Sequence, residues 1–240
     1  MHLTDAAPPR PTSRLLGRES VAWVVLVLSL LLTLGLWRYS EADHAAKSRD
    51  RFAYRADKQR IALQGRMLDY EQILRGAAAF FAASGEVSRE EWHTYFQTLQ
   101  LDRHLPGVQG TGFALMLPAG QREAHEAAVR AEGFPEYAIH PAGDRDILSA
   151  IVYIEPFSKL TRQVLGYDMY SEPVRREAMN RARDSGEAAL SGKLVLTQET
   201  DEVRLPGFLI YFPIYRKGLP LQTVDERRLA LLGFVYSRFR

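Results

Sequence analysis

The chain has 240 residues, 46% of them hydrophobic and 25% charged, and its 31 basic and 29 acidic side chains leave a net charge of +2. This composition excludes a wholly disordered chain, because there is enough apolar surface to form a core. With so small a net charge and no cluster of basic and aromatic side chains, no nucleic-acid partner is expected. The chain has no cysteine, which excludes disulfides, thiolate metal sites and cysteine nucleophiles but permits an extracytoplasmic location.

Residues 1–20 carry three prolines and scattered arginines, and they are predicted to form a short disordered cytoplasmic tail. Residues 21–38 are predicted to form a transmembrane helix. The run from Val21 to Trp37 has 17 residues without a charged side chain. As a helix it would be roughly 26 Å long, close to the ~30 Å hydrocarbon core of a bilayer. Aromatic side chains, which favour the membrane interface, stand near both of its ends: Trp23, Trp37 and Tyr39.

Three arginines precede this run, Arg10, Arg14 and Arg18, and by the positive-inside bias the N-terminus is cytoplasmic. The expected topology is a single pass through the inner (cell) membrane, with the rest of the chain periplasmic or extracellular. Two alternatives are open. A signal peptide would normally have a shorter apolar run followed by an Ala-x-Ala-like site, which is missing after Trp37. A buried core helix would leave the flanking arginines and tryptophans unexplained.

Residues 42–84 are predicted to form one long stalk helix, about 65 Å in length. The segment has no proline and is rich in good helix formers. Two interpretations are open, and both can hold for different portions: a homodimer formed through the stalk, or a helix packed along its own globular domain. Apolar residues recur at the a and d positions of a heptad repeat, interrupted once by Arg60: Ala53, Ala56, Leu63, Met67, Tyr70, Leu74, Ala77 and Phe81.

Residues 85–240 are predicted to form one α+β domain built on an antiparallel sheet of five to six strands, with helices on one side. Ser88 and Glu91 form a capping box for a first helix, and Ser171 is expected to cap another, which begins at Glu172 and ends at Gly186. Strand 207–215 is apolar on both faces, so it is expected to be central and covered on both sides. The other expected elements are a helix over 122–132 and strands over 113–117, 137–140, 149–154, 193–197 and 231–239.

The sequence contains no motif for catalysis, and no enzyme activity, cofactor or metal is predicted. His125 and Glu126 begin like a zinc-protease motif, but Val129 stands where the second histidine is required. The glycine-rich run 107–112 has the look of a phosphate-binding loop, yet it leads into a strand. The helix N-terminus that binds phosphate in such loops is therefore missing.

One segment is a candidate site, Leu165–Ser171, in which Asp168 stands among aromatic and sulfur-containing neighbours just before a helix. A carboxylate projected there into an apolar pocket would accept hydrogen bonds from a ligand and fix its orientation. The alternative is that Asp168 bonds to backbone amides of the turn ahead of the helix.

Seven short motifs stand in order along residues 52–239: Phe80–Ser84, Val87–Trp92, Leu105–Ala114, Tyr153–Pro156, Leu165–Ser171, Ala182–Gly186 and Tyr211–Tyr215. Together they resemble the CHASE family, the extracytoplasmic ligand-binding regions of receptor histidine kinases and nucleotide cyclases, which include plant cytokinin receptors. Each motif alone is weak, and their order makes the resemblance specific to the family.

The resemblance implies a long stalk helix followed by a PAS-like domain with a ligand pocket. In cytokinin-binding members an aspartate holds the adenine ring, and Asp168 within Gly166–Met169 stands at that place. Ser191 corresponds to a threonine of those receptors, and the pocket-lining strand after it corresponds to Leu194–Thr197, which brings in Leu194 and Leu196.

The chain departs from cytokinin-binding members at Gly166–Tyr167 and at Gly192–Lys193, so cytokinin is not predicted as the ligand. The predicted function is that of the membrane-anchored, ligand-sensing region of a receptor of histidine kinase or diguanylate cyclase type. A small molecule would bind in the pocket and shift the stalk helix. The pocket is expected to include four aromatic side chains as well: Tyr153, Tyr170, Tyr211 and Phe212.

Members of the family normally continue into a second PAS-like module, another transmembrane helix and an output domain. The chain stops at Arg240, so the expectation is either a fragment of a larger receptor or a short stand-alone sensor. The rival hypothesis is a membrane-anchored interaction module that dimerises through the stalk without any ligand.

Overall fold

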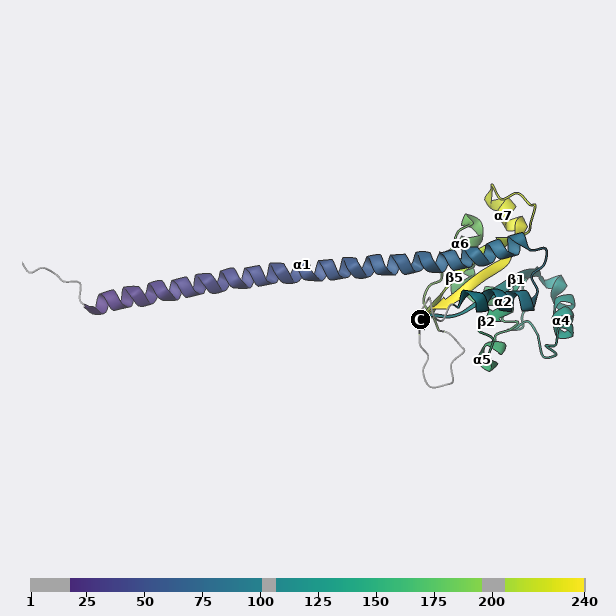
Figure 1. Ribbon diagram of the computed structural model, residues 1–240, viewed down its shortest axis with the longest axis horizontal. Helices are drawn as coiled ribbons and strands as arrows, with labels where there is room; N and C mark the ends of the chain where they lie inside the picture. Colours follow the sequence, from purple (N-terminus) through teal and green to yellow (C-terminus); the bar gives the residue numbers. More distant parts are fainter. Residues whose placement is uncertain (1–17, 101–106, 196–205, 240) are drawn as a thin grey trace, which may run out of the picture. The chain divides into compact units, whose positions relative to one another are not determined.

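The computed structural model describes residues 18–100, 107–195 and 206–239, which belong to two units, Met1–Leu63 and Gln64–Arg240. Helix α1 (Arg18–Ala83) begins in the first unit and ends in the second (Figure 1). It runs without interruption through the predicted transmembrane segment and the predicted stalk. A bend over residues 84–86 follows it, so the helix ends one residue before the predicted end of the stalk.

In the first unit, α1 contains one apolar stretch that is long enough to cross a membrane. Ser20–Arg38 has 19 residues and a mean hydropathy of 2.3, and none of it is buried. The hydroxyls of Ser29 and Thr33 donate to backbone carbonyls three and four residues earlier, which satisfies them within the helix. The exposure of the whole stretch argues against the alternative of a buried core helix.

The second unit is built on one antiparallel sheet of six strands: β1 (Val108–Pro118), β2 (Ile147–Glu155), β3 (Ala189–Leu190), β4 (Leu194–Val195), β5 (Pro206–Tyr215) and β6 (Leu231–Phe239). The order is β2-β1-β6-β5-β3, and β4 also pairs with β5. β5 therefore has neighbours on both sides, as its two apolar faces predict. The predicted α+β class and antiparallel sheet are confirmed.

One face of this sheet is covered by the last part of α1 and by α2 (Arg89–Leu99). Within residues 64–83, α1 buries Tyr70, Leu74 and Ala77 against the strands. These are predicted a and d positions, so this portion of α1 packs along its own domain, in line with the second of the two interpretations. α2 begins at the predicted capping box, in which Ser88 and Glu91 each accept the other's backbone amide.

The packing on this face is mostly aromatic. Trp92 of α2 is 1% exposed and lies among the rings of three other residues, with centroids 4.4 to 5.9 Å away: Phe81, Phe96 and Tyr153. The sheet contributes one buried polar pair here, since the hydroxyls of Thr111 and Ser237 are hydrogen-bonded to each other at 2.7 Å. We call this side the α1 face.

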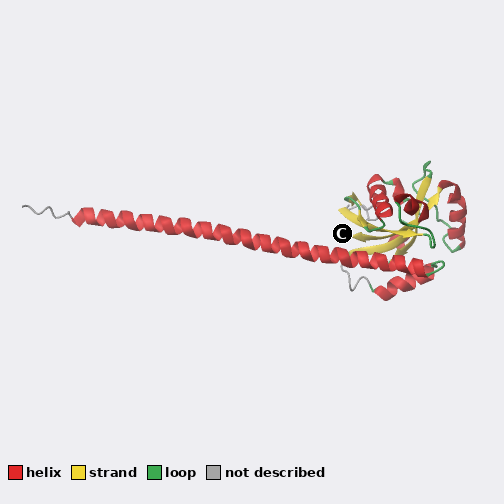
Figure 2. Cartoon of the chain, turned by 90° about the horizontal axis from the view of Figure 1, so that it is seen from above, coloured by secondary structure: helices red, strands yellow, loops and turns green. Residues whose placement is uncertain are grey.

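The other face is covered by α6 (Pro173–Ser185), which packs Ala178, Met179 and Ala182 onto the strands. We call it the α6 face. Figure 2 shows helices on both sides of the sheet, so the expectation of helices on one side only is wrong. The reason is physical: strands that are apolar on both faces need cover on both. Four short helices also lie between α2 and α6 in this unit: the 3-10 turn η1 (Ala119–Gln121), α4 (Arg122–Ala131), α5 (Lys159–Arg162) and the 3-10 turn η2 (Met169–Ser171).

The start of α6 differs by one residue from the expectation. Glu172, not Ser171, is the N-cap, and its carboxylate accepts the amides of Val174 and Arg175. Its longer side chain reaches the same amides that a serine cap would bind. At the other end the prediction is confirmed, because Gly186 ends the helix with a φ of 81°.

Two further expectations are corrected. Residues 137–140 form no strand, and within the described chain only His140 makes a bridge, with Tyr167. Tyr137 and Ile139 alternate as buried residues, which produces a strand-like pattern without a partner strand. Helix α7 (Val224–Ala230) was not expected, although Thr223 forms a capping box with the third residue of that helix.

Candidate ligand-binding site

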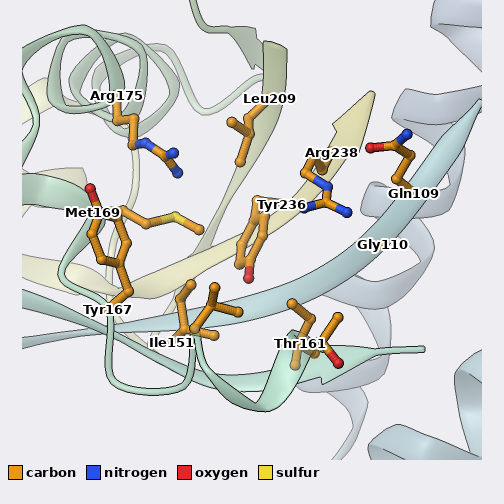
Figure 3. Close-up of a pocket in the computed structure, with 12 residues that line it drawn as sticks. Gln109, Gly110, Ile151, Thr161, Tyr167, Met169, Arg175, Leu209, Tyr236 and Arg238 are labelled. Atoms are coloured by element: carbon orange, nitrogen blue, oxygen red, sulfur yellow. The ribbon is translucent and has the colours of Figure 1, made fainter. Parts of the chain in front are cut away.

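A cavity of about 70 Å³ lies on the α6 face, between the sheet and the chain that leads from α5 into α6 (Figure 3). Strands β1, β2, β5 and β6 form its floor, and the segment 161–175 forms its cover. A mostly apolar wall with a few polar groups is usual for small-molecule sites. The lining residues are Gln109, Gly110, Ile151, Ile154, Thr161, Val164, Tyr167, Met169, Arg175, Leu209, Tyr236 and Arg238.

A β-bulge in β2 holds the cover against the sheet. Val152 is an extra residue in the pairing of β2 with β1. Beside it, the backbone of Ile151 forms two hydrogen bonds with the cover. Its carbonyl accepts the amide of Gly166 at 2.9 Å, and its amide donates to the carbonyl of Tyr167 at 3.3 Å. Gly166 has a φ of 80°, and a Cβ there would collide with the carbonyl of Ala138. The cover therefore closes the open edge of the sheet at β2.

Asp168 fixes the next turn of the cover, and the protein itself satisfies its buried carboxylate. Oδ1 accepts the amides of Ser149 and Tyr170 at 2.9 and 3.0 Å and the Ser149 hydroxyl at 3.0 Å. Oδ2 accepts Nε of Arg145 at 2.9 Å. Four donors match the capacity of an ionised carboxylate. This geometry corresponds to the second interpretation of Asp168, in which it braces the turn before a helix.

Three polar side chains that line the cavity each have a buried atom that lacks a hydrogen-bond partner in the described part of the chain: Nε of Arg175, the hydroxyl of Tyr236 and Oε1 of Gln109. Arg175 is 8% exposed, and its guanidinium carbon lies 5.2 Å from the centroid of the Tyr167 ring. Glu172 approaches its Nε only to 4.0 Å, which is beyond hydrogen-bond distance. Figure 3 shows this guanidinium pointing into the cavity.

Burial controls the protonation of the cavity's ionisable groups. It raises the pKa of the Tyr236 hydroxyl, and the neighbouring Tyr211 raises this pKa further. Burial also raises the pKa of Tyr211, so both phenols are neutral and able to donate. Burial lowers the pKa of Arg238, and the charge of Arg175 lowers it as well. The two guanidinium groups therefore repel each other within one cavity.

None of the described residues that the sequence predicted for the site lines this cavity. Some of them lie next to it, and others lie on the opposite face of the sheet. Leu194 and Tyr211 are buried in the core of the α6 face, where the Tyr211 hydroxyl contacts Sδ of Met169 at 3.6 Å. Ser191 accepts the amide of Leu209 at 2.9 Å and so supports a strand of the floor. Leu196 lies outside the described residues.

Tyr170 lies beside the cover, and its hydroxyl donates to Oδ1 of Asn180 in α6 at 2.6 Å. Tyr153 and Phe212 belong to the core of the α1 face, and the Tyr153 hydroxyl donates to the carbonyl of Val87 at 2.7 Å. Phe212 directly follows Tyr211 in β5, and successive side chains of a strand point to opposite faces. Tyr211 and Phe212 therefore do not face one pocket, which corrects that expectation.

The sequence contained a signal for Arg175 that the prediction did not use. Three fully buried residues follow it at spacings of three, four and seven: Ala178, Met179 and Ala182. These spacings place Arg175 on the inner stripe of its helix, where a cation is unusual. Within residues 18–100, 107–195 and 206–239, no group of three or more His, Asp or Glu side chains lies close enough together to hold a metal ion.

Comparison with known proteins defines the class. The family model of the CHASE domain matches residues 85–240, and the chain belongs to this family. It is similar to hybrid signal transduction histidine kinase A of Dictyostelium discoideum, with 27% identity over 260 aligned residues. The alignment covers 96% of this chain and 12% of the relative, whose enzymatic part lies outside this region. CHASE domains are sensory, so the domain at 85–240 is a sensory domain.

Proposed function

We propose that this chain is the membrane-anchored, ligand-sensing region of a receptor histidine kinase, with a PAS-like sensor domain that binds a small molecule. The cavity on the α6 face is the observation that carries the ligand-binding part. It combines an apolar wall with buried polar atoms that lack partners among the described residues, which is the composition of a site built for a ligand. The kinase type follows the similarity to the Dictyostelium protein.

The anchor is the apolar stretch Ser20–Arg38, with a cytoplasmic N-terminus and an exported sensor domain. A cysteine-scanning experiment tests this topology, since the chain has no cysteine of its own. Gly120 is open to solvent, with no atom within 4 Å of an added Cβ. A Gly120→Cys variant is expected to react with a membrane-impermeant maleimide on intact cells, and a Thr12→Cys variant only after lysis. Reaction of Thr12→Cys on intact cells would contradict this orientation.

Strand β6 supplies a route from the cavity to α1. Tyr236 faces the cavity, while Phe239, three residues later, lies on the α1 face with its ring centroid 4.3 Å from that of Tyr70 in α1. A ligand that displaces Tyr236 therefore acts on a strand whose opposite face holds the helix. Signalling is then a shift between two arrangements of the sensor domain and α1. The ligand favours the arrangement to which it binds more tightly.

The exposed portion of α1 is the proposed dimer interface. Its a and d residues Ala53, Ala56 and Leu63 are exposed, unlike those after Met67. A second copy would cover them in a coiled coil. The alternative function, an interaction module without a ligand, rests on the same observation. Analytical ultracentrifugation of the chain separates the two, because a dimer that responds to no ligand favours the alternative.

The test of ligand sensing is a thermal-shift screen of the whole chain in nanodiscs against small metabolites. A ligand at one hundred times its Kd stabilises by about 2.7 kcal/mol, which raises the midpoint by roughly 5–10 °C. Val164→Phe fills the cavity from its cover and is expected to abolish the shift. Val224→Phe, an equal enlargement at an exposed site on α7, is the matched control. A shift that survives Val164→Phe, or no shift with any metabolite, would contradict the proposal.

A further inference from the structure

The partnerless polar atoms of the second unit concentrate at one place. Of the five buried side-chain atoms without a hydrogen-bond partner in the described ranges, three line the cavity on the α6 face. Nε of Arg175 is one of these three, and none of the described residues that line the cavity is acidic. A buried cation whose nearest carboxylate lies beyond hydrogen-bond distance is poorly compensated, and a ligand that supplies a negative charge would stabilise it.

Arg175 shows this imbalance most clearly. Its side chain is 9% exposed, and it projects from the buried stripe of α6. Both carboxylate oxygens of Glu172, its ion-pair partner at 4.0 Å, already accept amides at the start of the helix. Its other contacts are the Tyr167 ring and the buried Tyr211 hydroxyl, with which its side chain is hydrogen-bonded. The guanidinium is thus desolvated and has no carboxylate within hydrogen-bond distance, and in Figure 3 it points into the cavity.

We propose, resting on the ligand-sensing function above, that the cavity binds a short aliphatic monocarboxylate, whose carboxylate is held by Arg175 and the hydroxyl of Tyr236. A guanidinium presents planar, parallel donors that match the two oxygens of a carboxylate. The neutral Tyr236 hydroxyl donates to the same group. The bound negative charge also offsets the repulsion between Arg175 and Arg238.

The rest of the wall selects an apolar tail over a symmetrical oxyanion. Inorganic phosphate exposes acceptor oxygens in every direction, and its outer oxygens would face aliphatic side chains without donors. A carboxylic acid instead places its carbon chain against those side chains, which are Ile151, Ile154, Val164 and Leu209. A cavity needs roughly 10–15 Å³ of free volume to hold one water, so a cavity of about 70 Å³ has room for an acid with a few non-hydrogen atoms, such as acetate or propanoate.

Calorimetric titration of the full chain in nanodiscs tests this assignment. The probes are acetate, propanoate, butanoate and hexanoate, with propanamide as the neutral isostere and inorganic phosphate as the alternative anion. Propanoate is expected to bind at least tenfold more tightly than propanamide and than hexanoate. Arg175→Met is expected to weaken propanoate binding at least tenfold, and Tyr236→Phe several-fold. Arg181→Gln, on the exposed side of the same helix, is the matched control and leaves the affinity unchanged.

If propanoate and propanamide bind equally tightly, the cavity does not recognise a carboxylate and the inference is wrong. Phosphate binding as tightly as propanoate would also contradict it. Propanoate binding that Arg175→Met leaves intact would overturn the role of this arginine. If none of the acids binds the native chain, the inference is wrong. Ligand sensing itself is judged separately, because a neutral metabolite whose thermal shift Val164→Phe abolishes would preserve that function without the carboxylate.

Discussion

The two faces of the sheet carry covers of similar kind but of different chemistry. On the α1 face, large rings pack between helix and strand, and Trp92 contacts three of them. On the α6 face, a cavity remains, and the polar groups around it include Arg175 and Tyr236 with partnerless atoms. We infer from this difference that the α1 face is packed for stability, whereas the α6 face keeps polar groups that the proposed ligand would pair.

Truncation on the α1 face is the largest change expected. Trp92→Ala removes a ring that is 1% exposed and leaves a cavity among aromatic neighbours, so the free energy of unfolding is expected to fall by about 3–5 kcal/mol. Leu229→Ala, at a residue that is 78% exposed, should change it by less than about 0.5 kcal/mol. Denaturant unfolding of the full chain in nanodiscs measures both. Similar values for the two variants would remove the stabilising role of the α1 face.

A smaller loss is expected at the cover of the cavity. In the native chain, Nε of Arg145 donates to Oδ2 of Asp168. Asp168→Asn keeps an acceptor for the amides of Ser149 and Tyr170 but places an amide NH2 group opposite this Nε. The free energy of unfolding should fall by about 2–3 kcal/mol, the value of a lost charge-assisted bond in a buried site.

Asp146→Asn, at an exposed loop position nearby, is the control for Asp168→Asn and is expected to be neutral. If Asp168 served only as a ligand contact, its substitution would weaken binding without moving the unfolding midpoint. Unfolding of both variants in the absence of added ligand therefore separates the two interpretations of this carboxylate.

The smallest effect distinguishes two buried tyrosines of the α6 face. The Tyr211 hydroxyl has a partner, Sδ of Met169, whereas the Tyr236 hydroxyl has none among the described residues. Tyr211→Phe is therefore expected to cost up to about 1 kcal/mol, and Tyr236→Phe to stabilise by up to about 1 kcal/mol, because it removes an unsatisfied buried group. Differential scanning calorimetry resolves this, as 1 kcal/mol shifts the midpoint by roughly 2–4 °C. Destabilisation by Tyr236→Phe would show that its hydroxyl serves the fold.

The fold was predictable wherever the determinants are local. The capping box of Ser88 and the alternation of β5 act within a few residues, and both appear as predicted. The predicted strand at 137–140 is wrong because Tyr137 and Ile139 are buried alternately in a segment without regular secondary structure, which gives the same period of two as a strand. Helix α7 has an equally local determinant, the capping box at Thr223, and was therefore predictable as well.

The site was less predictable, because its lining comes from positions between 109 and 238 that only the fold brings together. Family resemblance directed attention to Asp168, whose sequence neighbours Tyr167 and Met169 line the cavity. Strand alternation would have separated Tyr211 from Phe212 in advance. The inner stripe of α6 would have revealed Arg175 as a buried cation. The unpartnered state of its Nε depends on distances that the sequence does not contain.

The central claim is that the α6 face keeps polar groups for a ligand and not for the fold. The most direct measurement is the unfolding midpoint of Arg175→Met in the full chain without any added ligand. Removal of a desolvated and weakly paired cation by an apolar side chain of similar length is expected to leave the midpoint unchanged or to raise it. A fall by several degrees, of the kind expected for Trp92→Ala, would contradict the claim, because Arg175 would then hold the fold together.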